Sequence, residues 1–183
     1  MRAAFAATLL SSAVLSVAVA GCGGSGDSSA ADSWADDVCT SISDWKQDIR
    51  HAGDDIRAEL RSPSDGSLAR IGESVQSAAD ATTNLADDLK GMDAPDVDSG
   101  EQAKQQVDAF ATQLESTVDE TKTTVEDIPA SAGLAEIVSA LTALVPSLDA
   151  LADKGKSALA AVEATGTEIK DAFESADSCK SLR

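Results

Sequence analysis

Apolar residues recur alternately three and four positions apart along most of this chain, and this spacing constrains the fold more than any other feature. It draws one apolar stripe along each helix and is typical of helices packed side by side. No segment shows the alternation with period two that a half-buried strand requires. The sequence therefore predicts an all-α fold, an antiparallel four-helix bundle.

The first two helices are expected between residues 33 and 92. Ser33 is a suitable N-cap for the first helix, and Ser62-Pro63 stops it. Its stripe is Ala35, Val38, Ile42, Trp45, Ile49, Ala52 and Ile56. The second stripe is Leu68, Ile71, Val75, Ala78, Thr82, Leu85, Leu89 and Met92. We expect Ser62 or Ser67 to cap the second helix and Gly91 to end it in a left-handed conformation.

The third helix is expected to begin at Asp98, with Glu101 completing a capping box. Its stripe is Ala103, Val107, Phe110, Leu114, Thr117, Thr121, Thr124 and Ile128. From Leu134 to Cys179 the spacing keeps its phase across Pro146, which predicts one long helix kinked near Pro146. This helix is much longer than the second, so the alternative is that part of residues 134–145 folds over the end of the bundle.

The N-terminus predicts export. Arg2 precedes an apolar run from Ala3 to Val19, which has the shape of a secretory signal. The run is short for a membrane span and is followed by Gly, Ser and Asp, so a permanent span is the weaker alternative. Residues Val19-Ala20-Gly21-Cys22 resemble the lipobox of bacterial lipoproteins: a branched apolar residue, two small residues and Cys.

The lipobox resemblance implies cleavage before Cys22 and acylation of the Cys22 sulfur. Two or more acyl chains anchor a protein stably to a bilayer. The protein is then expected on the extracytoplasmic face of the cell membrane, with the bilayer as its partner through acylated Cys22. The alternative is ordinary signal cleavage near Ala18 to Ala20, with Cys22 unmodified.

Composition divides the chain into three regions. Residues 1–21 form the expected signal peptide. Residues 22–31 hold the lipidated Cys22 and a Gly- and Ser-rich stretch that predicts a flexible linker. Residues 32–183 are long enough for one helical domain.

Charge limits the possible partners of the mature protein. The chain carries 14 basic and 32 acidic residues, a net charge of −18, and loss of residues 1–21 removes only Arg2, which leaves −19. Such a charge repels nucleic acid, so we expect no nucleic-acid partner.

Cys39 and Cys179 are predicted to form a disulfide. An even pair of cysteines in an exported chain is typical of a structural bond. Four antiparallel helices bring the end of the last helix beside the start of the first, whereas five would separate them. Each cysteine lies on or next to the apolar stripe of its helix, so both side chains point inward.

No residue pattern predicts catalysis. His51 is the only histidine and has no second imidazole, thiol or serine motif beside it, so it is expected on the surface. The pairs Asp36-Asp37, Asp54-Asp55 and Asp87-Asp88 are expected on solvated faces, because neighbouring helical residues diverge by about 100°. We expect no catalytic residue, metal or cofactor, and no enzyme activity.

Two charged regions leave alternatives open. The acidic stretch from Asp93 to Glu101 suits a loop and helix cap better than a calcium site, because its glycine falls one position too early. Five basic residues gather around the first expected turn between helices: Lys46, Arg50, Arg57, Arg61 and Arg70. We expect surface pairing with acids such as Asp54 and Glu59, and docking of an anionic partner is the alternative.

The segment from Trp34 to Cys39, the following Trp45 and the end from Phe173 to Leu182 resemble uncharacterised exported helical proteins of high-GC Gram-positive bacteria. The resemblance supports the fold and the location and implies no activity. We therefore expect a non-enzymatic interaction or structural module of the cell envelope, with an envelope protein or wall component as partner. The alternative is a carrier that holds a lipid or similar apolar ligand in a groove between helices.

Overall fold

The computed structural model describes residues 26–62, 64, 66–126, 139, 146, 150 and 153–183. Five helices have defined bounds: α1 (Gly26–Arg61), α2 (Ser67–Gly91), α3 (Gly100–Glu126), α5 (Thr167–Ser175) and α6 (Asp177–Lys180). Residues 153–163 are also helical, and no strand occurs in the described ranges. The prediction of an all-α fold is confirmed.

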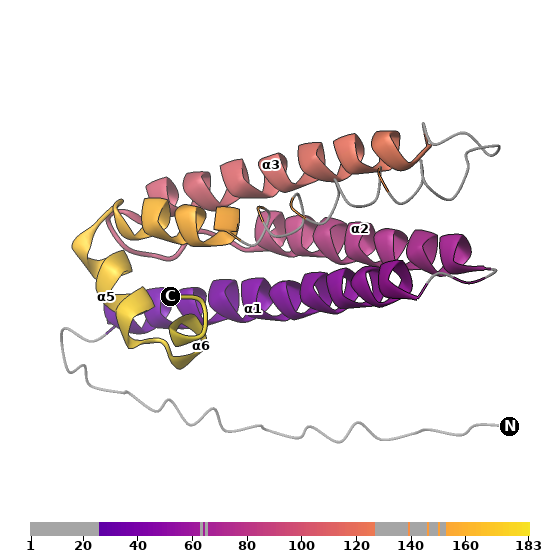
Figure 1. Ribbon diagram of the computed structural model, residues 1–183. Coiled ribbons are helices and arrows are strands. Elements are labelled where there is room, and N and C mark those ends of the chain that lie inside the picture. The colour runs from indigo at the N-terminus through magenta and orange to yellow at the C-terminus, as the bar shows by residue number, and fades with distance from the viewer. Residues whose placement is uncertain are drawn as a thin grey trace, which may run out of the picture.

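The three long helices form the body of the helical bundle (Figure 1). Successive helices run antiparallel, and α2 contacts both α1 and α3. Residues 153–163 lie beside α3 in this view, and the chain then crosses the end of the bundle to reach the beginning of α1. There α5 and α6 pack against α1, so the C-terminal end lies beside the first helix.

The predicted apolar stripes form the core. All seven positions of the first stripe are buried, as are Ala103, Val107, Phe110 and Leu114 of the third. On the second stripe Leu68 is exposed at 46%. Ser67 is buried in its place, because its hydroxyl accepts a hydrogen bond from the Ser64 amide and donates one to Glu59.

A polar contact at the centre explains why a threonine lies on an apolar stripe. Trp45 donates from its indole nitrogen to the Thr82 hydroxyl at 3.0 Å, and Thr82 donates to the Ala78 carbonyl at 2.7 Å. Both groups are therefore satisfied inside the core. The Trp45 ring also packs edge-on against Phe110, with centroids 6.4 Å apart.

The first helix begins earlier than composition indicates. It starts at Gly26, so residues 26–31 of the expected flexible linker are helical. Alanine favours the helix, and Ala31 is buried within the core cluster. Packing against the rest of the core therefore extends the helix beyond Asp32, the expected domain boundary.

The prediction of one continuous last helix is wrong in the described residues. Residues 164–165 form a turn, Gly166 is extended, and Ala176 separates α5 from α6. A β-carbon on Gly166 would lie 2.3 Å from the Ser99 hydroxyl, so the chain turns where it meets another loop. Pro146 itself is helical and exposed, but the expected kink around it lies outside the described residues.

The expected helix ends also differ from those observed. Among the described glycines only Gly66 has a positive φ, 94°, and it occupies the N-cap of α2 instead of Ser62 or Ser67. Gly91 ends α2 without a left-handed conformation. At the next turn α3 begins at Gly100 instead of Asp98, and the Ser99 carbonyl accepts from the Ala103 amide.

Gly100 is required by the close approach of another backbone. The Gly100 amide donates to the Val97 carbonyl, and the Val97 amide donates to the Pro95 carbonyl. A β-carbon on Gly100 would lie 1.9 Å from the Pro95 carbonyl oxygen. No flexible side chain can move to relieve such a contact, so the turn must deform to admit any other residue.

Two glycine substitutions should therefore have opposite effects on stability. Gly100→Ala is expected to lower the free energy of unfolding by about 2 kcal/mol or more, because it displaces the backbone of the turn. Gly72→Ala, in the middle of α2 with no atom near its β-carbon, should raise it by about 0.5 to 1 kcal/mol. Urea unfolding followed by circular dichroism measures both, and equal effects would contradict the role of Gly100.

Candidate functional site

The expected lipidation site, Cys22, lies outside the described residues, as does the expected signal peptide of residues 1–21. The first described helix begins at Gly26, four positions after Cys22. Its beginning is also where the C-terminal end of the chain docks. We call residues 167–183, which contain α5 and α6, the C-terminal strap.

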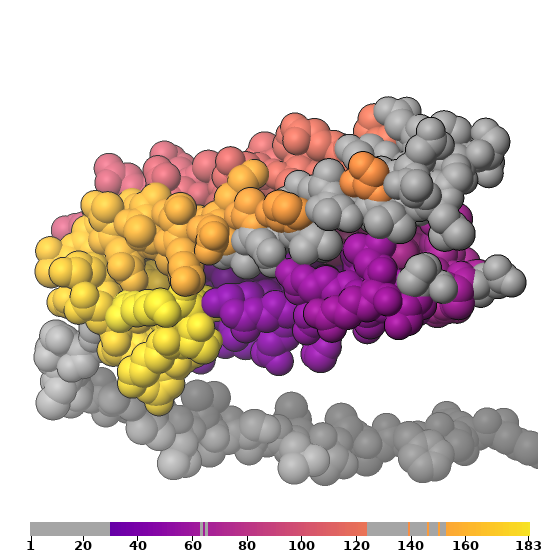
Figure 2. Space-filling model, viewed as in Figure 1, coloured from indigo at the N-terminus to yellow at the C-terminus, as the bar shows by residue number. Residues whose placement is uncertain are grey.

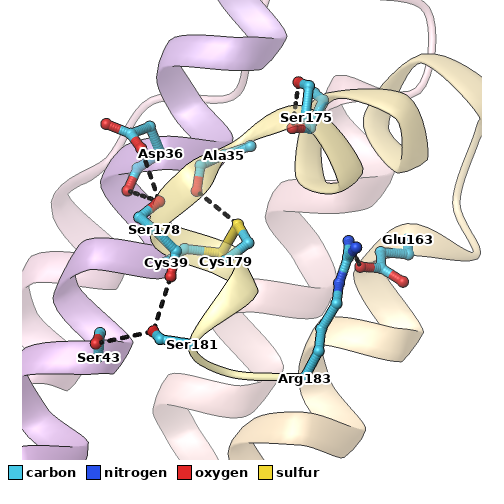
Figure 3. Close-up of a disulfide and its surroundings, with 11 residues drawn as sticks. Ala35, Asp36, Cys39, Ser43, Glu163, Ser175, Ser178, Cys179, Ser181 and Arg183 are labelled. Atoms are coloured by element: carbon cyan, nitrogen blue, oxygen red, sulfur yellow. Dashed lines mark hydrogen bonds and ion pairs between the residues drawn. A yellow bond between two sulfur atoms is a disulfide. The ribbon is translucent and has the colours of Figure 1, made fainter.

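A disulfide fastens the C-terminal strap to α1 (Figure 3). Cys39 on α1 and Cys179 on α6 are bonded with an S–S distance of 2.01 Å and a Cα–Cα distance of 5.0 Å. Both residues are buried in the core cluster. The predicted pairing is confirmed, and it joins residues 140 positions apart.

Hydrogen bonds surround the disulfide on both sides. Figure 3 shows the Ser178 hydroxyl bonded to Asp36, at 2.7 Å from its carboxylate oxygen, and the Ser181 hydroxyl 3.3 Å from that of Ser43. At the end of the chain Arg183 pairs with Glu163 at 2.9 Å. Because these groups are exposed, they align the C-terminal strap more than they stabilise it.

The apolar contact beneath the C-terminal strap is larger. The Phe173 ring of α5 meets the Trp34 ring of α1 edge-on, with centroids 5.8 Å apart and both side chains buried. Such pairs add about 0.5 to 1.5 kcal/mol to the burial of apolar surface. The buried indole nitrogen of Trp34 has no hydrogen-bond partner among the described residues, which opposes part of that gain.

A second structured corner lies at the turn between α1 and α2. Arg70 donates from Nε to Oε1 of Glu59 at 2.6 Å and from a terminal nitrogen to Oε2 at 2.8 Å. Ser67 donates to the same Oε2 at 2.7 Å. These bonds from Arg70, and then Ser67, lower the pKa of Glu59 from 4.5 to about 2. The expected pairing of basic residues is confirmed for Arg70, with Glu59, and for Arg57, with Asp54.

An open groove of about 510 Å³ runs between α1 and α2 beside this corner. Its lining includes His51 together with the acidic residues Asp48, Asp55, Glu59 and Glu73. His51 is exposed, as are the three expected aspartate pairs on the helices. The described residues contain no group of three or more His, Cys, Asp and Glu residues able to hold a metal ion.

The acidic loop between α2 and α3 does not gather its carboxylates. Asp93, Asp96 and Asp98 are exposed, whereas Pro95 and Gly100 are buried where the turn folds on itself. The loop therefore serves to position α3. Within the described ranges, no helix combines the length and the apolar character needed to cross a bilayer.

No protein-family model, curated protein or solved structure matches this chain.

Sequence reasoning missed the division of the C-terminal strap into two short helices and the role of Arg70 in joining two serines to Glu59. One residue in the sequence does indicate a break before the C-terminal strap. Gly166 interrupts a helical pattern shortly before Phe173. No sequence pattern indicates how close Glu59 and Arg70 lie, because the conformation of the α1–α2 turn determines that distance.

Loss of the disulfide should destabilise the protein strongly. Closing a loop of this length corresponds to about 5 kcal/mol on the chain-entropy model, so Cys39→Ala/Cys179→Ala should lower the free energy of unfolding by up to that amount. Ser181→Ala, which removes only the exposed hydrogen bonds of that hydroxyl to Ser43 and to the Ser178 carbonyl, should change it by less than about 0.5 kcal/mol. Denatured, unreduced protein should contain no reactive Cys39 or Cys179 thiol, and finding two would disprove the bond.

The Glu59 corner should lose its contribution in acid. A carboxyl with a lowered pKa in the folded state stabilises the protein above its unfolded pKa, and this contribution disappears as pH falls from about 4.5 to 2. Glu59→Gln should therefore destabilise the protein at pH 6 and have little effect near pH 2. Urea midpoints at both pH values test this, with Glu73→Gln in the same groove as control. A pH-independent effect of Glu59→Gln would contradict it.

Proposed function

We propose that this protein is a lipoprotein held on the extracytoplasmic face of the cell membrane by acylated Cys22, and that it acts as a non-enzymatic interaction or structural module of the cell envelope. An envelope protein or a wall component would be its partner. The lipobox residues Val19 to Cys22 carry the proposal for the anchor.

The disulfide is the structural observation that best supports export. Stable disulfides are typical of extracytoplasmic compartments and rare in reducing ones. Here the bond between Cys39 and Cys179 is fully enclosed, and hydrogen bonds of the C-terminal strap flank it. Many of the buried residues are alanines, which bury little area each, so the cross-link matters more than it would in a leucine-rich bundle.

The full architecture proposed here is an antiparallel four-helix bundle. Its fourth helix would end with residues 153–163 and include the kink expected near Pro146. Gly155 supports this arrangement, because its β-carbon position lies 3.6 Å from Ile42 and 3.7 Å from Trp45 of α1. The C-terminal strap then closes one end of the bundle as a separate element.

The packing of the interior supports a rigid module. The aromatic pairs Trp45–Phe110 and Trp34–Phe173 occupy the core, and the expected aspartate pairs and His51 lie on the surface. Such an arrangement offers side chains to a partner outside instead of enclosing a substrate. This supports an interaction role over catalysis.

One observation favours the carrier as a second candidate. A groove of about 530 Å³ lies between α3 and residues 153–163, and its apolar lining is Ala109, Phe110, Ala158 and Ala161. Polar residues including Gln106, Gln113 and Lys154 share the lining, which suits an amphipathic ligand. Lipid in native mass spectra of the purified protein would favour this candidate.

The anchor can be tested by changing Cys22. Cys22→Ala should move the protein from the membrane fraction, and inhibition of the lipoprotein signal peptidase should leave the uncleaved precursor. Gly24→Ala, two residues away, is the matched control and should leave fractionation unchanged. Detergent partitioning and intact mass measure the outcome. An unchanged membrane fraction for Cys22→Ala, or the absence of lipid mass on Cys22, would overturn the proposal.

A further inference from the structure

The groove between α3 and residues 153–163 differs in charge from the rest of this acidic protein. Lys154 is the one charged residue in its described lining, and no carboxylate is among the ten lining residues. The groove between α1 and α2, by contrast, is lined by four acidic residues, and the chain as a whole carries 32. The protein as a whole therefore repels an anion, whereas this groove offers it a cation.

The contacts of Lys154 identify the two ends of this groove. Lys154 donates from Nζ to the Thr117 hydroxyl at 3.3 Å, and residues 153–163 run antiparallel to α3 (Figure 1). Lys154 therefore lies at the end of the groove nearer the end of α3, and Ala161 lies at the end nearer its beginning. Figure 2 shows the orange surface of residues 153–163 beside that of α3 and continuing toward the yellow C-terminal strap. The groove thus has a cationic end and an end that points to the strap.

The end that points to the strap is apolar. Ala109 and Ala161 are exposed there, one on each wall of the groove, and Ala158 is half-buried. Phe110 is 5% exposed and forms part of the floor. Because the side chains on both walls are methyl groups, the groove stays open, with a volume of about 530 Å³. An acyl chain lying in it would remove apolar surface of both partners from water.

The cationic end supplies polar groups for the head group of a ligand. Lys154 is half-buried, and its ammonium has three N–H donors, of which the Thr117 hydroxyl accepts one. Ser116 and Gln113 are exposed in the lining at the same end. A carboxylate bound to Lys154 would accept a charge-assisted hydrogen bond. One positive charge matches one negative charge, which favours a monoanion over a head group with two charges.

The direction of the groove matches that of a lipid in the membrane beneath an anchored protein. Its apolar end points toward the C-terminal strap, which packs against the beginning of α1. That helix begins at Gly26, four residues after Cys22. In a bilayer an acyl chain points to the membrane interior and its carboxylate to water. A fatty acid that entered the groove from that end would keep this direction, with its carboxylate at Lys154.

We propose that the groove between α3 and residues 153–163 binds a single long-chain fatty acid, with its carboxylate on Lys154 and its chain over Ala158 and Ala161. This rests on the carrier, the second candidate function, and names the ligand class of that same groove. The cation in a lining without carboxylates carries the choice of an anionic head group. Ala161 is seven residues beyond Lys154, about 10 Å along the helix, so the first part of the chain lies in the groove and the rest continues toward the strap.

The test uses the full mature acylated protein in lipid nanodiscs. The probe is dodecanoic acid that carries a photoreactive diazirine, and its methyl ester is the uncharged counterpart. The acid should label peptides of α3 and of residues 153–163 more strongly than the ester does. Lys154→Gln should lower labelling by the acid about fivefold or more, to the level of the ester. Lys170→Gln makes the same change in net charge on α5 and should lower labelling less than about twofold.

A second pair of variants tests the apolar end. Ala161→Leu should fill the groove and lower labelling by both probes about fivefold or more. The neighbouring Ala160 is exposed and lies outside the lining, so Ala160→Leu is the matched control and should leave labelling unchanged. Intact mass and peptide mapping measure the labelling, and circular dichroism with a thiol count verifies that each variant is folded.

Several outcomes would overturn the proposal. Labelling that does not saturate, or equal effects of Ala160→Leu and Ala161→Leu, would exclude the groove as the binding site. Equal labelling by the acid and the ester would reject the anionic head group, and stronger competition by lysophosphatidylglycerol than by unlabelled dodecanoate would reject the fatty acid. A neutral lipid in native mass spectra would keep the carrier and reject this ligand. Failure of the Cys22 anchor would change fractionation, whereas labelling of Cys22→Ala by the acid in buffer would persist, so the two proposals fail separately.

Discussion

The bond between Cys39 and Cys179 is the constraint on which the rest of the structure depends. It joins the first helix to an element that begins after the chain has already turned away from the bundle. Without it, the C-terminal strap would be held only by its buried apolar residues, with the Trp34–Phe173 contact among them, and by exposed hydrogen bonds. With it, the C-terminal strap covers the beginning of α1, where Ile169, Phe173 and Leu182 are buried against the core.

The core combines branched aliphatic residues with many alanines and a few aromatic rings. Alanines on the stripes let helices approach closely, and the β-carbon position of Gly155 lies within van der Waals contact of Ile42 and Trp45. The polar residue in the centre, Thr82, is satisfied by Trp45 and by its own helix. The disulfide adds a constraint that does not depend on the apolar area buried in this core.

The pairing of charged residues also depends on how the helices pack against one another. Around the α1–α2 turn, Arg70 is joined to Glu59 and both are neutralised. On the other side of α1, Arg57 pairs with Asp54, and Lys46 is subject to the positive charges of Arg50 and Lys156 and to the negative charge of Asp153.

The sequence by itself determined the helical class, most of the buried positions and the cysteine pairing. Helix periodicity is local, and a residue such as Ile49 or Leu114 faces inward whenever its neighbours on the same stripe do. Only two cysteines follow Cys22, so the sequence leaves one possible pairing within the helical domain, Cys39 with Cys179. The tertiary structure alone decided where helices begin and end: Gly166 turns because Ser99 occupies its flank, and α3 starts at Gly100 because Pro95 leaves no room for a side chain. Those contacts join residues from separate segments, so no local pattern contains them.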